Sequence, residues 1–378
     1  MIGSLKSSAL KVLKTDAFSF VAAQSISRPL SALGSVTPKQ RFEAALMLEP
    51  VDRVPLFYQH LGAASYLQKA TGLLTKDGYA DPRVFAKLSM EAYKQFGFDN
   101  VMAGWGDLLV EAHAHGTEWK FTDSRFYPRV VKYVPIEKIT SIQPVDPLQD
   151  RSWSVQLQAA RIMLETVGKE VAVVACLNSP ALIASEIIGI ENLMLAQYKT
   201  PDWMHQLLRT ITESSRAYGE EIARIGLEDI FIENGTAGME LVSREQYEKS
   251  DRRYLQDEMQ LFKHLGLRTI IHNCSALPYY ESQLELAPNA IHIHLVAVNP
   301  QELFASVKDK TCMMAGIDHA KLLFKGTPDE VEAEVRRIIE LWGDSPGLIM
   351  APGCELPFKT PLENIARLRE ATIKYGSR

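Results

Sequence analysis

Two short apolar runs each lead into residues of metal-binding type. The run over residues 269–271 ends in His272 and Cys274, which are separated by one residue. On an extended strand, residues i and i+2 project from the same face, so we expect one imidazole and one thiolate side by side. A second run, over residues 347–350, is followed on its loop by Cys354. The three side chains therefore predict one site built from two strand ends.

One histidine and two cysteines match the ligand set of a catalytic zinc site, in which a substrate takes the fourth position. Zinc is favoured because thiolates and imidazole suit it better than they suit magnesium or calcium. The alternative is that the cysteines are buried structural residues, a common role for a free cysteine. Cys176 and Cys312 lie inside apolar runs, and we interpret both as core residues of that kind.

Composition favours an ordinary globular protein and excludes several partners. The chain has 378 residues, of which 46% are hydrophobic and 23% charged, with a formal net charge of -5. This balance predicts no nucleic-acid partner. No apolar stretch approaches the roughly 20 residues of a membrane span, so no membrane association is expected. Four cysteines are too few for a disulfide scaffold of this size, which favours a reducing, cytoplasmic location.

Residues 1–36 differ in composition from the rest of the chain. They are rich in Ser and Ala, carry Lys and Arg, and contain one acid, Asp16. We expect an N-terminal helical extension that packs on the body or on a partner subunit, where it could mediate a homodimer. A transit peptide is the alternative.

Residues 37–378 are predicted to form one catalytic domain. Short apolar strands alternate with amphipathic helices, which indicates a parallel sheet covered by helices. Counting from residues 51–59 gives about eight strands, so a (β/α)8 TIM barrel is the expected fold, with a doubly wound sheet as the alternative. A small hairpin is expected over residues 116–134. The predicted strands are 51–59, 98–108, 171–180, 229–235, 269–275, 289–295, 311–318 and 347–353.

These residues resemble the uroporphyrinogen decarboxylase superfamily, and in particular its zinc-dependent branch of corrinoid methyltransferases. The resemblance runs from about Thr37 to the C-terminus. It rests on TPKQRFEAALMLEPVDRVP, GFDNVMAGWGDLLVEAHAHG, NSPALIASEIIGIENLM, IIHNCS, AGIDHAKLLFKGTPDEV and APGCELPFKTPLENI, in this order. The decarboxylases carry an arginine-rich motif after the VP dipeptide, whereas this chain has LFYQHLGAAS there, with no arginine. The departure favours the methyltransferase branch.

The resemblance implies a methyl transfer between a corrinoid and a small thiol, ether or similar molecule, with zinc as cofactor. The chain lacks an Asp-x-His-x-x-Gly corrinoid motif, so the resemblance also implies that the corrinoid arrives on a separate protein, which docks over the barrel mouth. A metal-free decarboxylase-like lyase and a non-catalytic zinc-binding barrel are the competing interpretations.

Several further residues follow strand ends, where a barrel places its chemistry. Glu233 is the first candidate for a fourth zinc ligand and His294 the second, whereas Glu355 is expected to support a ligand. Asp107, Asn234 and Asp318 are candidate catalytic residues that line the pocket or orient a ligand or substrate. Tyr58 and Trp105 could form an apolar wall of the pocket, while His319 is expected to face solvent, and His60, His113 and His115 are individually uninformative.

Overall fold

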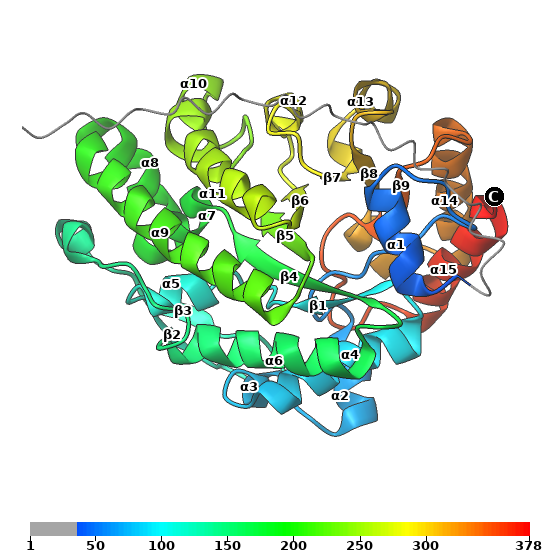
Figure 1. Ribbon diagram of the computed structural model, residues 1–378, viewed down its shortest axis with the longest axis horizontal. Helices are drawn as coiled ribbons and strands as arrows, with labels where there is room; N and C mark the ends of the chain where they lie inside the picture. Colours follow the sequence, from blue (N-terminus) through cyan, green and yellow to red (C-terminus); the bar gives the residue numbers. More distant parts are fainter. Residues whose placement is uncertain (1–35) are drawn as a thin grey trace, which may run out of the picture.

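Seven parallel strands form a curved sheet surrounded by helices in the computed structural model, which describes residues 36–378 (Figure 1). Every strand pairs with its neighbours in chain order. A doubly wound sheet reverses its strand order at a switch point, so the sequential order excludes that alternative. The strands are β1 (Asn100–Ala103), β4 (Ala172–Asn178), β5 (Asp229–Glu233), β6 (Arg268–Asn273), β7 (Ala290–His294), β8 (Cys312–Ile317) and β9 (Leu348–Pro352).

Residues 54–58 lie between the two edge strands, β9 and β1, but do not form a regular strand. The Phe57 amide donates to the Met350 carbonyl at 2.9 Å, and the Asp99 amide donates to the Leu56 carbonyl at 2.9 Å. Within residues 36–378, this segment pairs with a strand through one parallel bridge, between Leu56 and Met350. The predicted strand over 51–59 is therefore not confirmed as a regular strand, and the sheet of the described residues has seven strands rather than the expected eight.

Side chains explain why this segment is irregular. The Leu56 amide donates to Asp99 Oδ2 at 2.8 Å, and the Tyr58 amide donates to Asn100 Oδ1 at 2.6 Å. The backbone groups that would pair with β1 are thus bound by side chains, and Pro55 has no N–H to contribute. The segment stays attached to both edges without a continuous ladder.

Most of the helices cover the outer face of the sheet, and their caps follow from the sequence. Thr37 and Thr327 each form a capping box with the residue three positions later, before a proline at the first helical position. The helices are α1 (Pro38–Leu46), α2 (Ala64–Thr71), α3 (Thr75–Gly78), α4 (Pro82–Phe96), α5 (Val110–Ala114), α6 (Arg151–Val167), α7 (Pro180–Ile188), α8 (Ile190–Lys199), α9 (Pro201–Ile225), α10 (Arg244–Tyr247), α11 (Arg253–His264), α12 (Tyr280–Leu284), α13 (Pro300–Val307), α14 (Pro328–Trp342) and α15 (Leu362–Gly376).

Smaller elements complete the described chain. The predicted hairpin is present as β2 (Glu118–Lys120) and β3 (Arg129–Lys132). A π-helical turn, η3 (Glu248–Arg252), separates α10 from α11, and a second, η5 (His319–Phe324), follows β8. No helix among residues 36–378 is both long and apolar enough to cross a membrane.

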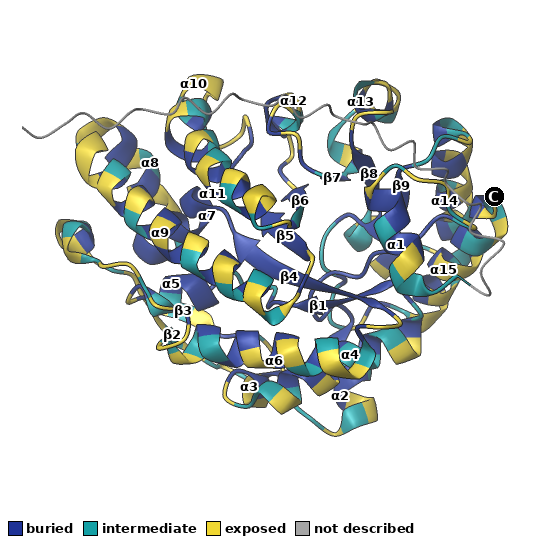
Figure 2. Ribbon diagram, viewed as in Figure 1, coloured by how far each residue is buried: buried dark blue, intermediate teal, exposed yellow. Residues whose placement is uncertain are grey.

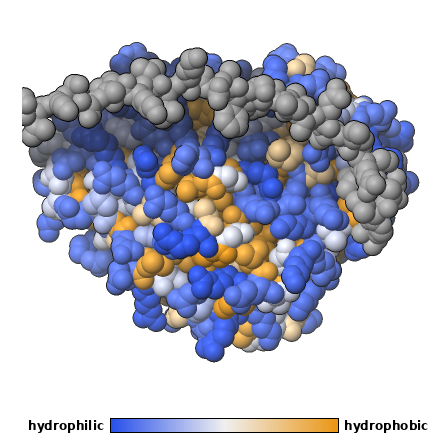
Figure 3. All heavy atoms as spheres, viewed as in Figure 1, coloured by the Kyte–Doolittle hydropathy of each residue, from blue (hydrophilic) through white to orange (hydrophobic). Residues whose placement is uncertain are grey.

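The strands alternate between two apolar layers, as the period of two requires. Inward-facing residues form a core inside the curved sheet, which α1 closes with Phe42 and Leu46; Cys176 and Cys312 belong to this core, as predicted. Outward-facing residues pack on the helices. Figure 2 shows the strands buried and the helices exposed along one side, and Figure 3 shows a mainly hydrophilic periphery with apolar residues nearer the centre of that face. The N-terminal extension predicted for 1–36 lies outside the described residues, apart from its last position.

Candidate metal centre

Four polar side chains sit in register across neighbouring strands, above the apolar core. Asn178 on β4 pairs with Glu233 on β5, Glu233 with His272 on β6, and His272 with His292 on β7. Each lies two residues beyond an inward-facing core position, such as Phe231 before Glu233. The strands thus end in a layer of polar groups at the carboxyl end of the sheet.

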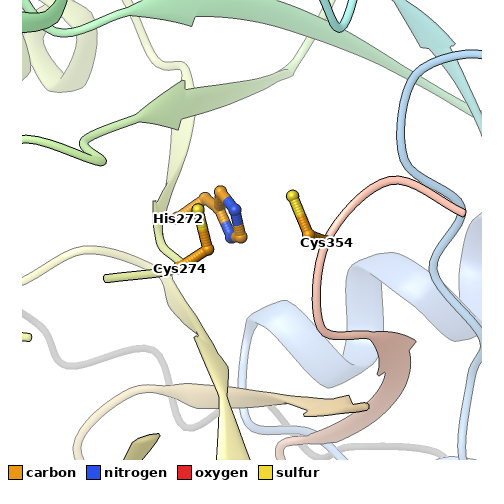
Figure 4. Close-up of side chains that lie close together, drawn as sticks. All are labelled: His272, Cys274 and Cys354. Carbon is orange, nitrogen blue, oxygen red and sulfur yellow. The ribbon is translucent and has the colours of Figure 1, made fainter. Parts of the chain in front are cut away.

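The structure brings His272, Cys274 and Cys354 together at this end. One potential ligand atom from each lies within 4.8 Å of the other two. Figure 4 shows the imidazole and the Cys274 thiol on β6 and its following loop, with the Cys354 thiol facing them from the loop after β9. His272 is fully buried, Cys354 is half-buried and Cys274 is exposed. A buried imidazole beside one exposed and one half-buried cysteine suits an ion near the surface that a substrate can reach.

The ring nitrogens of His272 test whether the residues fit a metal. Neither nitrogen has a hydrogen-bond partner among the described residues, although both are buried. The nearest carboxylate atom, Glu233 Oε2, lies 3.5 Å from Nε2, which is too long for a good hydrogen bond. Buried polar atoms nearly always have a bonding partner. A bound metal ion would supply this partner to the His272 imidazole, whereas packing alone would not.

The two thiols affect each other's pKa in opposite directions. A hydrogen bond with Cys354 holds the pKa of Cys274 well below its usual range, and His272 lowers it further. The same interaction with Cys274, together with burial, raises the pKa of Cys354. Cys274 therefore loses its proton more readily than Cys354, and it is the thiolate form that binds zinc.

Glu233 connects this cluster to the irregular segment. Gln59 Nε2 donates to Glu233 Oε1 at 3.0 Å, and His60 Nε2 lies 2.7 Å from the same oxygen. Burial raises the pKa of Glu233, but His272 and His60 outweigh burial and lower it. The carboxylate lies between the two imidazoles, at a place from which it can orient His272. Its predicted role as a fourth ligand stays a prediction.

Gln59 and His60 were not identified from the sequence. Both follow the irregular segment directly, and they are separated from Glu233 by more than 170 residues in the chain. One feature of the sequence could have identified Gln59. It lies two residues beyond the inward-facing Phe57, just as Glu233 lies two residues beyond the inward-facing Phe231.

The three candidate catalytic residues occupy different surroundings. Asn234 is fully buried and its amide donates to both oxygens of Asp251 at 3.0 Å, so it does not face the cluster. Asp318 caps the start of η5 through the amides of Ala320 and Lys321. Asp107 has both carboxylate oxygens buried without a partner among the described residues, and burial raises its pKa to about 7.

A cavity of about 250 Å³ adjoins the loop that carries Cys354. Its lining is mainly apolar and includes Glu355, whose Oε1 accepts a hydrogen bond of 2.6 Å from the Tyr127 hydroxyl. Tyr58 and Trp105 are instead buried and pack within the core, so neither is part of the wall of this cavity. The lining residues are Leu61, Ala64, Thr75, Arg125, Phe126, Tyr127, Glu355, Leu356, Pro357 and Phe358.

Known proteins resemble this chain in sequence over nearly its whole length. The methylcobamide:CoM methyltransferase MtbA of Methanosarcina mazei is 26% identical, covering 90% of this chain and 98% of the relative. The methylcobamide:CoM methyltransferase MtaA of Methanosarcina barkeri is also 26% identical, covering 91% and 99%. A uroporphyrinogen decarboxylase of Anaeromyxobacter dehalogenans is 20% identical, covering 89% and 99%.

The fold is shared with a solved methyltransferase from Methanosarcina mazei, with a TM-score of 0.81 and 24% identity, over 90% of this chain and 99% of that one. The family model described as uroporphyrinogen decarboxylase (URO-D) matches residues 37–375. The chain therefore belongs to the URO-D family.

Proposed function

We propose that this protein is a zinc-dependent methyltransferase that moves a methyl group between a corrinoid protein and a small thiol, ether or similar molecule. The observation that carries the proposal is the convergence of His272, Cys274 and Cys354 at the carboxyl end of the sheet. The relatives named as methylcobamide:CoM methyltransferases support it, because they match over nearly their full length.

His272, Cys274 and Cys354 would hold the zinc ion. When bound, zinc deprotonates a thiol or stabilises a departing alkoxide or thiolate. Glu233 positions the His272 imidazole, and Gln59 and His60 hold Glu233 in place. Three protein ligands leave a fourth position for the substrate, and the exposed side of Cys274 gives access to it.

The surroundings of the cluster favour methyl transfer over the decarboxylase alternative. In this chain, the segment after Pro55 directs Gln59 and His60 to a carboxylate beneath the cluster. A tetrapyrrole with many carboxylates would instead need cationic partners from this segment. A metal-free lyase would also have no use for two thiols beside a buried imidazole.

Several wider features belong to the same proposal. Residues 54–58 would act as the eighth strand of a (β/α)8 barrel within a catalytic domain over 37–378. The corrinoid would be carried by a separate protein that docks over the carboxyl end of the sheet. The four free thiols suit a reducing, cytoplasmic compartment.

The test is the zinc content of the purified protein beside that of two variants, His272→Ala and Cys354→Ser. We expect one ion at the cluster in the wild type and its loss in both variants. Cys312→Ala is the matched control, because Cys312 is a buried core thiol outside the cluster, and it should retain the ion. A wild type that binds no zinc at the cluster would contradict the proposal.

Turnover separates an enzyme from a zinc-binding barrel without activity. Enzyme and one thiol from a panel are added to methylcobalamin, and the absorbance of the methyl–cobalt bond is followed. We expect this absorbance to decrease as the methyl group is transferred to the thiol. Cys354→Ser should abolish this change and Cys312→Ala should not. A zinc-loaded protein that demethylates no methylcorrinoid, free or protein-bound, would favour the non-catalytic interpretation.

A further inference from the structure

A second group of metal-binding side chains lies at the ends of the next two strands. His294 is the last residue of β7, and Asp318 and His319 follow β8 directly. One potential ligand atom from each of the three lies within 4.8 Å of the other two. All three side chains are half-buried. Their grouping was not expected from the sequence, which placed His294 near the zinc ion and His319 in solvent.

The two imidazoles are held together but do not satisfy each other. Their ring centroids are 5.2 Å apart and the ring planes are tilted by 55°, so the rings are not stacked. His294 Nε2 and His319 Nδ1 are both buried, and neither has a hydrogen-bond partner among residues 36–378. Buried ring nitrogens without partners are rare unless an ion or a water molecule binds them.

The backbone makes room for this group beside the first cluster. A Cβ atom on Gly353 would lie 2.2 Å from His294 Cδ2, so only glycine lets the imidazole lie against this turn. Asp318 is fixed by its own backbone contacts, since Oδ1 accepts from the Ala320 and Lys321 amides. No hydrogen bond to the second oxygen, Oδ2, is found within the described chain, which leaves it able to act as a ligand.

We propose that His294, Asp318 and His319 form a second divalent-metal site, separate from the cluster of His272, Cys274 and Cys354. Two imidazoles and one carboxylate suit zinc, iron(II) or cobalt(II), and they leave positions open for an oxygen donor. Such an ion would place positive charge next to the first cluster, where it can hold an oxygen-bearing or anionic part of a substrate. The site does not depend on the proposed methyl transfer.

Cobalt(II) distinguishes the two sites, because cobalt bound by thiolates absorbs strongly in the near ultraviolet and cobalt bound by imidazole and carboxylate does not. Metal-depleted full-length protein is titrated with Co²⁺, and bound ions are counted by equilibrium dialysis. We expect two ions per chain, of which one produces the thiolate band. His294→Ala and His319→Ala should each bind one ion fewer and keep the thiolate band.

Two further variants keep the test decisive. Asn caps helices about as well as Asp, so the Asp318→Asn variant should fold. Its affinity for the second ion should nevertheless fall by at least roughly tenfold. His264→Ala removes an exposed histidine at the end of α11 and should still bind two ions. A single ion in the wild type would overturn the proposal, as would loss of the thiolate band in His294→Ala, because His294 would then bind the first ion.

Discussion

The Nε2 atom of His60 lies 2.7 Å from Oε1 of Glu233, and both side chains are almost completely buried. The other oxygen of Glu233 lies 3.5 Å from His272 Nε2. Burial lowers the pKa of His60, but the side chains of Cys176 and Glu233 outweigh burial and raise that pKa well above its ordinary value. Both pKa shifts favour an ion pair between His60 and Glu233, next to the imidazole of His272.

Replacing His60 should destabilise the protein, because a buried glutamate would lose its charged partner. For His60→Ala we expect a loss of about 3–5 kcal/mol in the free energy of unfolding, measured by urea denaturation. His264→Ala, at an exposed position, is the control and should change this free energy little. A His60→Ala protein as stable as the wild type would show that Glu233 is neutral or finds another partner.

Replacing Glu233 should weaken metal binding without abolishing it. Glu233→Gln keeps the shape of the side chain but loses the charge that faces His272. If Glu233 positions His272, zinc affinity should fall about 10–100-fold while the number of ions at full occupancy stays the same. Isothermal titration with zinc measures both quantities. Loss of the bound ion itself would instead identify Glu233 as a ligand.

Asp99 should be a major source of stability beside the irregular segment of residues 54–58. Its side chain is fully buried and accepts from Arg41 Nη1 at 2.7 Å, from Arg53 Nη2 at 2.9 Å and from the Leu56 amide at 2.8 Å. Asp99→Ala leaves two buried or half-buried arginines without this partner, so unfolding free energy should fall by about 3–5 kcal/mol. Urea denaturation measures it.

The control for Asp99 is an aspartate in an exposed ion pair. Asp123 binds Arg125 near the surface, so solvent screens the pair and Asp123→Ala should have little effect on unfolding. If both variants lost the same free energy of unfolding, burial of Asp99 would not determine how much it contributes to stability.

The fold was largely predictable because each strand and helix has a local signal. Apolar strands alternate with helices that have capping residues, and this pattern alone indicates a parallel sheet. Residues 51–59 are the exception. Their apolar pattern predicts a strand, but in the structure the side chains of Asp99 and Asn100 accept hydrogen bonds from backbone amides that a regular strand would use for pairing. Long-range contacts of this kind leave no trace in the local pattern.

The grouping of His272, Cys274 and Cys354 was predictable because two of these residues belong to one strand and the turn that follows it. His272 and Cys274 lie two residues apart, so the period of a strand places them on one face, and Cys354 follows a strand in the same way. His60 and the grouping of His294 with Asp318 and His319 were not predicted. These contacts depend on which strand ends become neighbours, and a single histidine at a strand end does not reveal its partner.

Asp107 should make the protein less stable as the pH rises. Burial raises the pKa of its carboxyl group from 3.8 to about 7. Between these two values the folded state binds more protons than the unfolded state, so stability falls by up to about 1.4 kcal/mol for each unit of increasing pH. Above about pH 7 both states are ionised and this loss is complete.

Asp107→Asn removes this titration while keeping the size of the side chain. Its unfolding free energy should depend less on pH between 4 and 7, and the variant should gain stability relative to the wild type at pH 8. Urea denaturation at pH 5, 6, 7 and 8 checks both expectations, with Asp77→Asn as the control at an exposed position on α3. If the unfolding free energy of Asp107→Asn varied with pH as steeply as that of the wild type, the prediction would be wrong. The Asp107 carboxylate of the wild type would then already be ionised at pH 5 and stabilised by a bound cation or by water.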